Sequence, residues 1–151
     1  MSILSAQSLR LFRPLSPLRD AYRIELDGHT LSGGLGPAGY DIALAQAVNL
    51  GSGGFALASA VELFNMRDNI AARVHDKSTW ARRGVTVQNT FIEPGWRGYL
   101  TLELTNHSPR MVHIPQGAPI AQVVFEWVDA PTELPYSGKY QDQEAGPQEA
   151  R

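Results

Sequence analysis

Short stretches of alternating apolar and polar residues run along most of the chain, and turn-forming residues separate them. The clearest stretch is Tyr99–Thr105, in which leucines at 100, 102 and 104 alternate with threonine and glutamate. Alternation of this kind places the two sorts of side chain on opposite faces of a strand. Strands are predicted on this basis at Tyr22–Leu26, Tyr40–Leu44, Phe55–Phe64, Val85–Phe91, Tyr99–Thr105, Met111–Ile114 and Ala121–Val128.

Glycine and proline fall between these strands rather than in a single linker. Turns are predicted at Asp27-Gly28, Gly33-Gly34, residues 51–54, Pro94-Gly95 and residues 115–117. Two short helices are predicted, Ile3–Phe12, which Arg13-Pro14 ends, and Ser78–Arg83, which starts at a capping-type serine. Short strands with closely spaced turns predict an all-β fold, namely a sandwich, a jelly roll or a small barrel.

The length and composition predict one domain with a tail. A chain of 151 residues, 43% of them apolar, can bury a sizeable core. We assign that domain to residues 1–137. Residues 138–151 have no apolar periodicity, so we expect them to be mobile in the free protein.

Charge and composition exclude several classes of function. The 13 basic and 15 acidic residues nearly balance, which does not fit a general nucleic-acid binder. The chain has no cysteine, so a cysteine-ligated zinc site is excluded, and its four histidines are not spaced as metal ligands. No apolar run is long enough to span a bilayer and no signal peptide is recognisable, so we expect a cytoplasmic protein without membrane contact.

The segment Lys77–Arg82 has the composition of a phosphate-binding turn. It combines a lysine, a serine hydroxyl and the free backbone N–H groups of a predicted helix start. Ser78 and Arg82 are four residues apart and therefore share a helix face. A capped surface turn with solvated charges would have the same composition.

Glu103 stands on the polar face of the strand Tyr99–Thr105. If that face lines a partly enclosed pocket, desolvation would raise the pKa of Glu103 towards the range of a general acid or base. If the face meets solvent, Glu103 is an ordinary surface glutamate. Glu93, at the predicted Pro94-Gly95 turn, would lie in the same region if a hairpin connects the two segments.

Four segments, in their order along the chain, resemble the dCTP deaminase and trimeric dUTPase superfamily, and its deaminase branch in particular. They are Gly36–Asp41, Lys77–Arg82, Ile92–Asn106 and Pro135–Gln143. The second resembles the R-S-S-L-A-R turn of that family, and the third its I-D-P-G-W segment with a downstream L-E pair. The resemblance implies a distorted β-barrel or jelly roll that forms a homotrimer, with active sites at subunit contacts. It also implies a triphosphate held with Mg²⁺, with no metal ligands from the protein and no zinc.

The resemblance implies hydrolytic deamination of dCTP to dUTP and ammonia, in the supply of dUTP for dTTP synthesis. Glu103 would be the general acid and base, with Ser78 and Arg82 positioning water, base or phosphate. Gln88 and Asn89 would offer amide contacts to the base. The nucleotide-binding residues on this reading are Lys77, Ser78, Thr79, Arg82, Gln88, Asn89, Glu93, Thr101, Leu102, Glu103, Gln122, Tyr136, Lys139 and Gln143. The last three would close over the nucleotide when the tail becomes ordered.

Two departures from the family pattern bear on the base and on the reaction. The segment between Arg82 and Glu93, which shapes the base pocket, is shorter than in typical deaminases, so the specificity for the base is open. Glu93 stands where the family normally has aspartate, and this longer side chain favours a deaminase over a dUTPase. The alternatives are a bifunctional enzyme that carries dCTP on to dUMP, a dUTPase, and a nucleotide-binding regulator without turnover.

Overall fold

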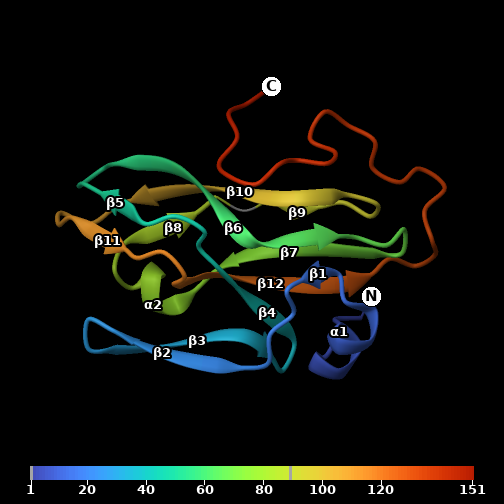
Figure 1. The fold of residues 1–151 in the computed structure, drawn as a ribbon, viewed down its shortest axis with the longest axis horizontal. Coiled ribbons are helices and arrows are strands. Elements are labelled where there is room, and N and C mark those ends of the chain that lie inside the picture. The colour runs from blue at the N-terminus through green and yellow to red at the C-terminus, as the bar shows by residue number, and fades with distance from the viewer. Residues whose placement is uncertain (1, 89) are drawn as a thin grey trace.

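The computed structural model describes residues 2–88 and 90–151, and it is built mainly of β-strands (Figure 1). The described helices are α1 (Ala6–Phe12) and α2 (Ser78–Ala81). The described strands are β1 (Leu15–Ser16), β2 (Tyr22–Leu26), β3 (His29–Gly36), β4 (Gly39–Ala43), β5 (Val48–Leu50), β6 (Phe55–Asn65), β7 (Ile70–Asp76), β8 (Val85–Val87), β9 (Phe91–Ile92), β10 (Arg97–Asn106), β11 (Val112–Ile114) and β12 (Pro119–Trp127). The predicted all-β fold with short helices is confirmed.

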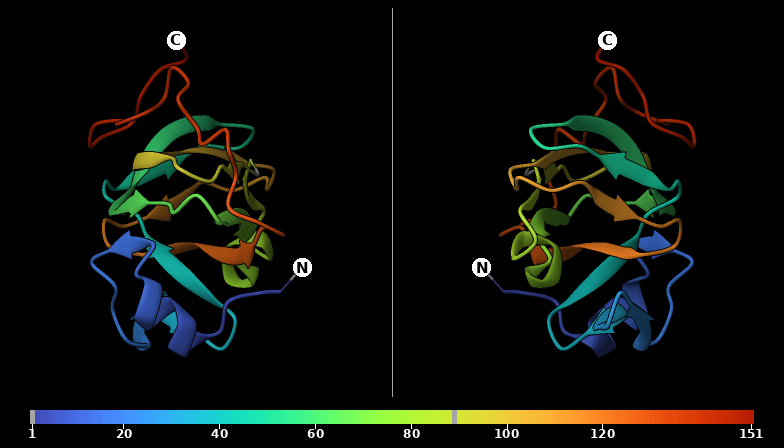
Figure 2. Two further views of the ribbon diagram at one scale, coloured as in Figure 1. Left: turned by 90° about the vertical axis from the view of Figure 1, so that its right-hand side faces the viewer. Right: turned by 90° about the vertical axis from the view of Figure 1, so that its left-hand side faces the viewer.

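The described strands form sheets that curl around one core. One sheet has the strand order β1-β6-β10-β8, a second has the order β2-β3-β4-β12-β7-β9, and β11 pairs with β5. Trp80, Tyr40, Phe64 and Phe125 are the bulkiest fully buried side chains between them. The chain after β12 crosses to the side of the molecule opposite α1 and the β2–β3 hairpin, as both views in Figure 2 show.

Several predicted boundaries differ from the structure, and the largest difference concerns Gly33-Gly34. These residues were predicted to form a turn but lie inside β3, paired with β2 on one side and β4 on the other. The reason is packing: a Cβ on Gly33 would lie 2.3 Å from Cζ of Tyr22, so only glycine lets the tyrosine ring cross the strand. No strand was predicted from the sequence at β1, β3, β5 or β7.

The predicted strand Val85–Phe91 is two strands in different sheets. β8 pairs with β10, whereas β9 pairs with β7 in the other sheet. The predicted helix Ile3–Phe12 starts only at Ala6, because Ile3 forms an antiparallel bridge with Glu126. Lys77, not Ser78, occupies the cap position of α2, which ends at Ala81.

The Asp27-Gly28 and Pro94-Gly95 turns are confirmed. Asp27 and Gly28 both have positive φ angles, and they connect Leu26 to its register partner His29 in a two-residue hairpin loop. At the second turn, the Trp96 N–H donates to the Glu93 carbonyl over 3.2 Å. This turn carries the chain from β9 into β10 and so places Glu93 beside the start of β10.

Within residues 2–88 and 90–151, no helix has the length and apolar content needed to cross a membrane.

One carboxylate lies inside the core. Even-numbered residues of β6 face inward, and Glu62 on that face is 2% exposed. Its two carboxylate oxygens lie 3.3 and 3.2 Å from the Ala43 nitrogen, whose N–H they accept. Burial raises the pKa of Glu62 to about 7, while the Ala43 N–H and the positive charge of Arg19 lower it by less.

The pKa of Glu62 predicts a stability that falls as the pH rises. The folded-state pKa of about 7 exceeds that of an unfolded glutamate, so between the two values the folded protein binds more protons. We expect ionisation of Glu62 to cost on the order of 3 kcal/mol of unfolding free energy between about pH 5 and about pH 8. Glu62→Gln keeps an acceptor for the Ala43 N–H, and its unfolding free energy should not fall between these two pH values. Urea denaturation at both pH values measures the unfolding free energy. The same pH dependence in variant and wild type would contradict the raised pKa of Glu62.

Candidate functional site

A cavity of about 530 Å³ lies against one face of β10, and the C-terminal segment forms part of its wall. We call it the Glu103 cavity. Residues from β6, β9, β10 and the C-terminal segment line it: Phe55, Leu57, Thr90, Phe91, Ile92, Glu93, Trp96, Leu100, Thr101, Glu103, Tyr136, Tyr140, Gln143, Gln148, Glu149 and Ala150. Five of the predicted nucleotide-binding residues therefore meet here: Glu93, Thr101, Glu103, Tyr136 and Gln143.

The alternation in β10 explains why Glu103 points into the cavity. Leu102 and Leu104 are buried in the core, and Thr101 and Glu103 lie on the other face. Leu57 on β6 is the register partner of Glu103 and also lines the cavity, so the carboxylate has an apolar neighbour. Burial raises the pKa of Glu103 above the ordinary value of a glutamate. The carboxylate therefore has a partly enclosed position, in which a glutamate can act as a general acid and base.

Polar groups next to Glu103 come from two directions. The Gln88 N–H donates to the Glu103 carbonyl over 3.0 Å, which places Gln88 beside the catalytic candidate. The Thr101 hydroxyl accepts hydrogen bonds from the Gln143 amide (3.0 Å) and from the Gln148 backbone N–H (3.1 Å). Leu102 itself faces the core, so only its main chain is available there. The predicted Asn89 lies outside the described residues.

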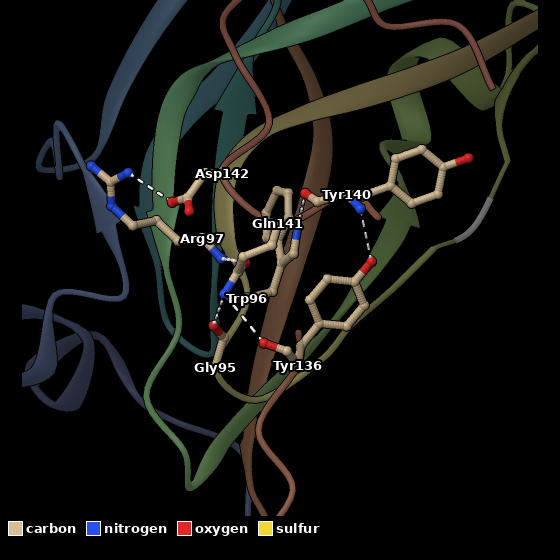
Figure 3. A network of polar contacts seen from close by, with 7 residues as sticks. All are labelled: Gly95, Trp96, Arg97, Tyr136, Tyr140, Gln141 and Asp142. Carbon is tan, nitrogen blue, oxygen red and sulfur yellow. Dashed lines mark hydrogen bonds and ion pairs between the residues drawn. The ribbon is translucent and has the colours of Figure 1, made fainter. Parts of the chain in front are cut away.

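The C-terminal segment is docked on β10 and on the turn before it (Figure 3). The Trp96 indole N–H donates to the Tyr140 carbonyl over 2.8 Å, and the Tyr140 N–H donates to the Tyr136 hydroxyl over 3.2 Å. Lys139 is exposed, with its ammonium against the Arg151 carbonyl and over the Tyr140 ring. The mobility of this segment in the free protein stays a prediction.

A second group of predicted residues lies around α2. Lys77 forms an ion pair with Asp41 (2.8 Å) and donates to the Ser32 hydroxyl (2.9 Å). The Lys77 and Asp41 side chains are only 10% and 12% exposed. Gln122 on β12 is the register partner of Asp41, so it belongs to this group and not to the Glu103 cavity.

The remaining residues of the α2 group face solvent or a second cavity. Ser78 is exposed and Thr79 partly exposed, and the Arg82 N–H donates to the Ser78 carbonyl over 3.0 Å. Arg82 lines a cavity of about 690 Å³ together with Arg83 and Arg110. Within one chain, the structure therefore assigns Arg82 and Glu103 to the walls of different cavities.

Several residues of the Glu103 cavity were not predicted from the sequence. Phe55 and Phe91 line it with exposed fractions of 59% and 45%, unusual for phenylalanine. Phe55 and Leu57 are two residues apart on β6 and therefore lie on the same face, so alternation along that strand could have identified Phe55. Trp96 lines the cavity from the turn before β10. Tyr140 and Gln148 line it because the C-terminal segment docks on β10, which alternation does not predict.

The described residues offer no metal-binding cluster. Glu93, Glu103 and Glu149 all line the Glu103 cavity, but nowhere in residues 2–88 and 90–151 do three histidines or carboxylates gather closely enough to hold an ion. A magnesium ion held by protein side chains alone does not fit this site.

The sequence matches a family model described as dCTP deaminase-like over residues 41–128. A dCTP deaminase from Campylobacter curvus is 46% identical over 93 residues, which are 60% of this chain and 50% of that protein. A dCTP deaminase from Gemmatimonas aurantiaca is 45% identical over 92 residues, 59% of this chain and 50% of that protein. This chain spans about half the length of these curated relatives.

The fold is similar to solved dUTPase structures. A mutant dUTPase from phage phi11 of S. aureus, described with a structural Mg(II) ion, has a TM-score of 0.59 at 16% identity. The similarity covers 78% of this chain and 92% of that one. The native dUTPase of EIAV has a TM-score of 0.56 at 18% identity, over 68% of this chain and 85% of its own. At this identity the likeness concerns the fold.

The Lys77–Asp41 pair predicts strong coupling between the two residues. Removing either charge leaves the other poorly solvated, so we expect Lys77→Met and Asp41→Asn each to lower the unfolding free energy by about 2 kcal/mol. The double variant should lose much less than the sum. Urea denaturation of the four proteins measures this coupling. The matched control is the exposed Arg10–Asp20 pair, with side chains 56% and 79% exposed. Additive effects at Lys77 and Asp41 would contradict the prediction.

Proposed function

Because the chain belongs to the dCTP deaminase-like family, we propose that it hydrolyses dCTP to dUTP and ammonia. One observation carries the proposal: Glu103 lines a partly enclosed cavity in which burial raises its pKa, beside the Thr101 hydroxyl. A carboxylate in this setting can take up a proton from water and return it later in the reaction.

In the proposed reaction, the Glu103 carboxylate takes a proton from water as the water oxygen bonds to C4 of cytosine. The oxygen–C4 bond makes C4 tetrahedral, and the proton passes to the ring nitrogen N3, which takes up the electron pair of the former C4–N3 double bond. Glu103 then moves the remaining hydroxyl proton to the amino group, the C4–N4 bond breaks, and ammonia leaves. Thr101 and the main chain of residues 101–103 hold the edge of the base, and the products balance as dUTP and ammonia.

Charge supports a site shared between chains of a homotrimer. The lining of the Glu103 cavity includes Glu93 and Glu149 but no lysine or arginine among the described residues. A triphosphate needs cations, and Arg82, Arg83 and Arg110 line the other cavity. We infer that the arginine-lined cavity of one copy faces the Glu103 cavity of another. Magnesium would enter with the triphosphate as its counter-ion.

Glu103→Gln tests the catalytic role directly. With dCTP as substrate and ammonia release as the measurement, we expect a fall in turnover of about 100-fold or more. Nucleotide affinity should be retained, because the amide keeps the size of the side chain. Glu25→Gln on the exposed face of β2 is the control and should behave as wild type. As the pH is lowered, wild-type turnover should fall when Glu103 becomes protonated. Because burial raises the pKa of Glu103, this fall should come at a higher pH than for an ordinary glutamate.

The products separate the proposal from its alternatives. Ammonia without pyrophosphate from dCTP supports the deaminase, whereas both products with dUMP indicate the bifunctional enzyme. Pyrophosphate from dUTP alone indicates a dUTPase. Tight nucleotide binding with no product, or equal turnover by Glu103→Gln and wild type, would contradict the catalytic assignment.

Mixing two inactive variants tests the shared site. Glu103→Gln and Arg82→Ala each remove one half, so each homotrimer should be inactive. When the two chains are refolded together, about a quarter of the sites should combine an intact Glu103 with an intact Arg82 from a neighbour. Activity near that level is the expected result. No recovery in mixed trimers, verified by mass, would place both residues in a site within one chain.

A further inference from the structure

The side chain of Gln141 connects the C-terminal segment to the turn that leads into β10. Its amide oxygen accepts the Arg97 N–H over 2.9 Å, and its amide nitrogen donates to the Gly95 carbonyl over 2.9 Å and to the Tyr136 carbonyl over 3.2 Å (Figure 3). One uncharged side chain thus satisfies three backbone groups from two segments. Neither the alternation pattern nor the family resemblance singled out Gln141.

Beyond Gln141 the chain contacts the start of β10 through backbone hydrogen bonds and one isolated bridge. The Asp142 N–H donates to the Arg97 carbonyl (2.8 Å), and the Tyr99 N–H donates to the Gln143 carbonyl (2.9 Å). Gly98 forms a parallel bridge with Gln143. A Cβ on Gly98 would lie 2.8 Å from the Gln143 nitrogen, so glycine permits this approach.

The register that Gln141 fixes determines where its neighbours lie. Gln143 is 6% exposed and donates from its amide to the Tyr99 carbonyl (2.8 Å) and the Thr101 hydroxyl (3.0 Å), within the wall of the Glu103 cavity. Tyr140, on the other side of Gln141, also lines that cavity. All these contacts join residues of one chain.

We propose that Gln141 is a positioning residue whose three hydrogen bonds hold the C-terminal segment closed over the Glu103 cavity. This rests on the proposed function, in which Tyr136, Lys139 and Gln143 contact the nucleotide. The segment exchanges between closed and open forms, and the three hydrogen bonds of Gln141 favour the closed form. The apparent affinity for nucleotide then scales with the closed fraction, because the open form lacks part of the site.

Gln141→Met in the full chain tests the proposal, since methionine has a similar length and forms none of the three hydrogen bonds. Trypsin cuts after Lys139 only when the segment is open, and mass spectrometry of fragment 140–151 gives the rate. Without nucleotide, we expect the variant to be cut about tenfold faster than wild type. The KM for dCTP should rise by a similar factor while kcat changes by less than about twofold.

Asp142→Asn is the matched control. It removes only the exposed ion pair with Arg97, whose side chains are 50% and 67% exposed, and asparagine tolerates the φ of 55° at this position. We expect wild-type cleavage and KM. Gln141→Glu is a second variant, which keeps the acceptor for the Arg97 N–H but sets a charged oxygen against two carbonyls. It should open the segment as Gln141→Met does.

Equal cleavage of Gln141→Met and wild type would overturn the proposal, as would faster cleavage with an unchanged KM. Cleavage of the wild-type segment as fast as a free peptide of the same sequence would also overturn it. The cleavage assay needs no substrate, so its result stands apart from the proposed activity. If no variant turns over dCTP while Gln141→Met still opens the segment, the positioning role holds and the proposed function fails.

Discussion

Both the core and the candidate site depend on the alternation of buried and less buried side chains along β10. Its even-numbered residues pack in the core, with Leu102 and Leu104 essentially inaccessible, and Thr101 and Glu103 occupy the other face. A shift of one residue in the pairing with β6 would bury Glu103 and expose the leucines. The energy of core packing therefore fixes the face of the strand on which the catalytic candidate lies.

Uncharged amide side chains attach the irregular segments to this framework. The Asn106 amide donates to the carbonyls of Leu50, Gly51 and Arg110, at the far end of β10 from the docked tail. Gln141 has the corresponding function at the near end. An amide both donates and accepts, so it can satisfy backbone groups that no strand pairs, without the desolvation cost of a buried charge. Both ends of β10 are fixed in this way, and the Glu103 cavity lies between them.

The two cavities differ in the sign of the charged side chains that line them. The carboxylates of Glu93, Glu103 and Glu149 surround one cavity, and the three arginines Arg82, Arg83 and Arg110 line another. The arginines suit the phosphates of a nucleotide triphosphate, and the Glu103 cavity suits its base, so neither cavity alone suits the whole nucleotide. The trimer that we propose brings the two kinds together, and in it Lys77 would have to exchange its ion pair with Asp41 for phosphate.

The sequence by itself determined the features that depend on near neighbours in the chain. Alternation determined the face of β10 on which Glu103 lies, and local turn chemistry determined the Asp27-Gly28 and Pro94-Gly95 turns. Tertiary contacts decided the rest. Gly33 lies in a strand because the Tyr22 ring crosses it, and the segment after β8 changes sheets because β9 finds its partner in β7. Only the folded chain places Gln141 against Arg97 and separates Arg82 from Glu103, because these relations depend on distant strands that no local pattern encodes.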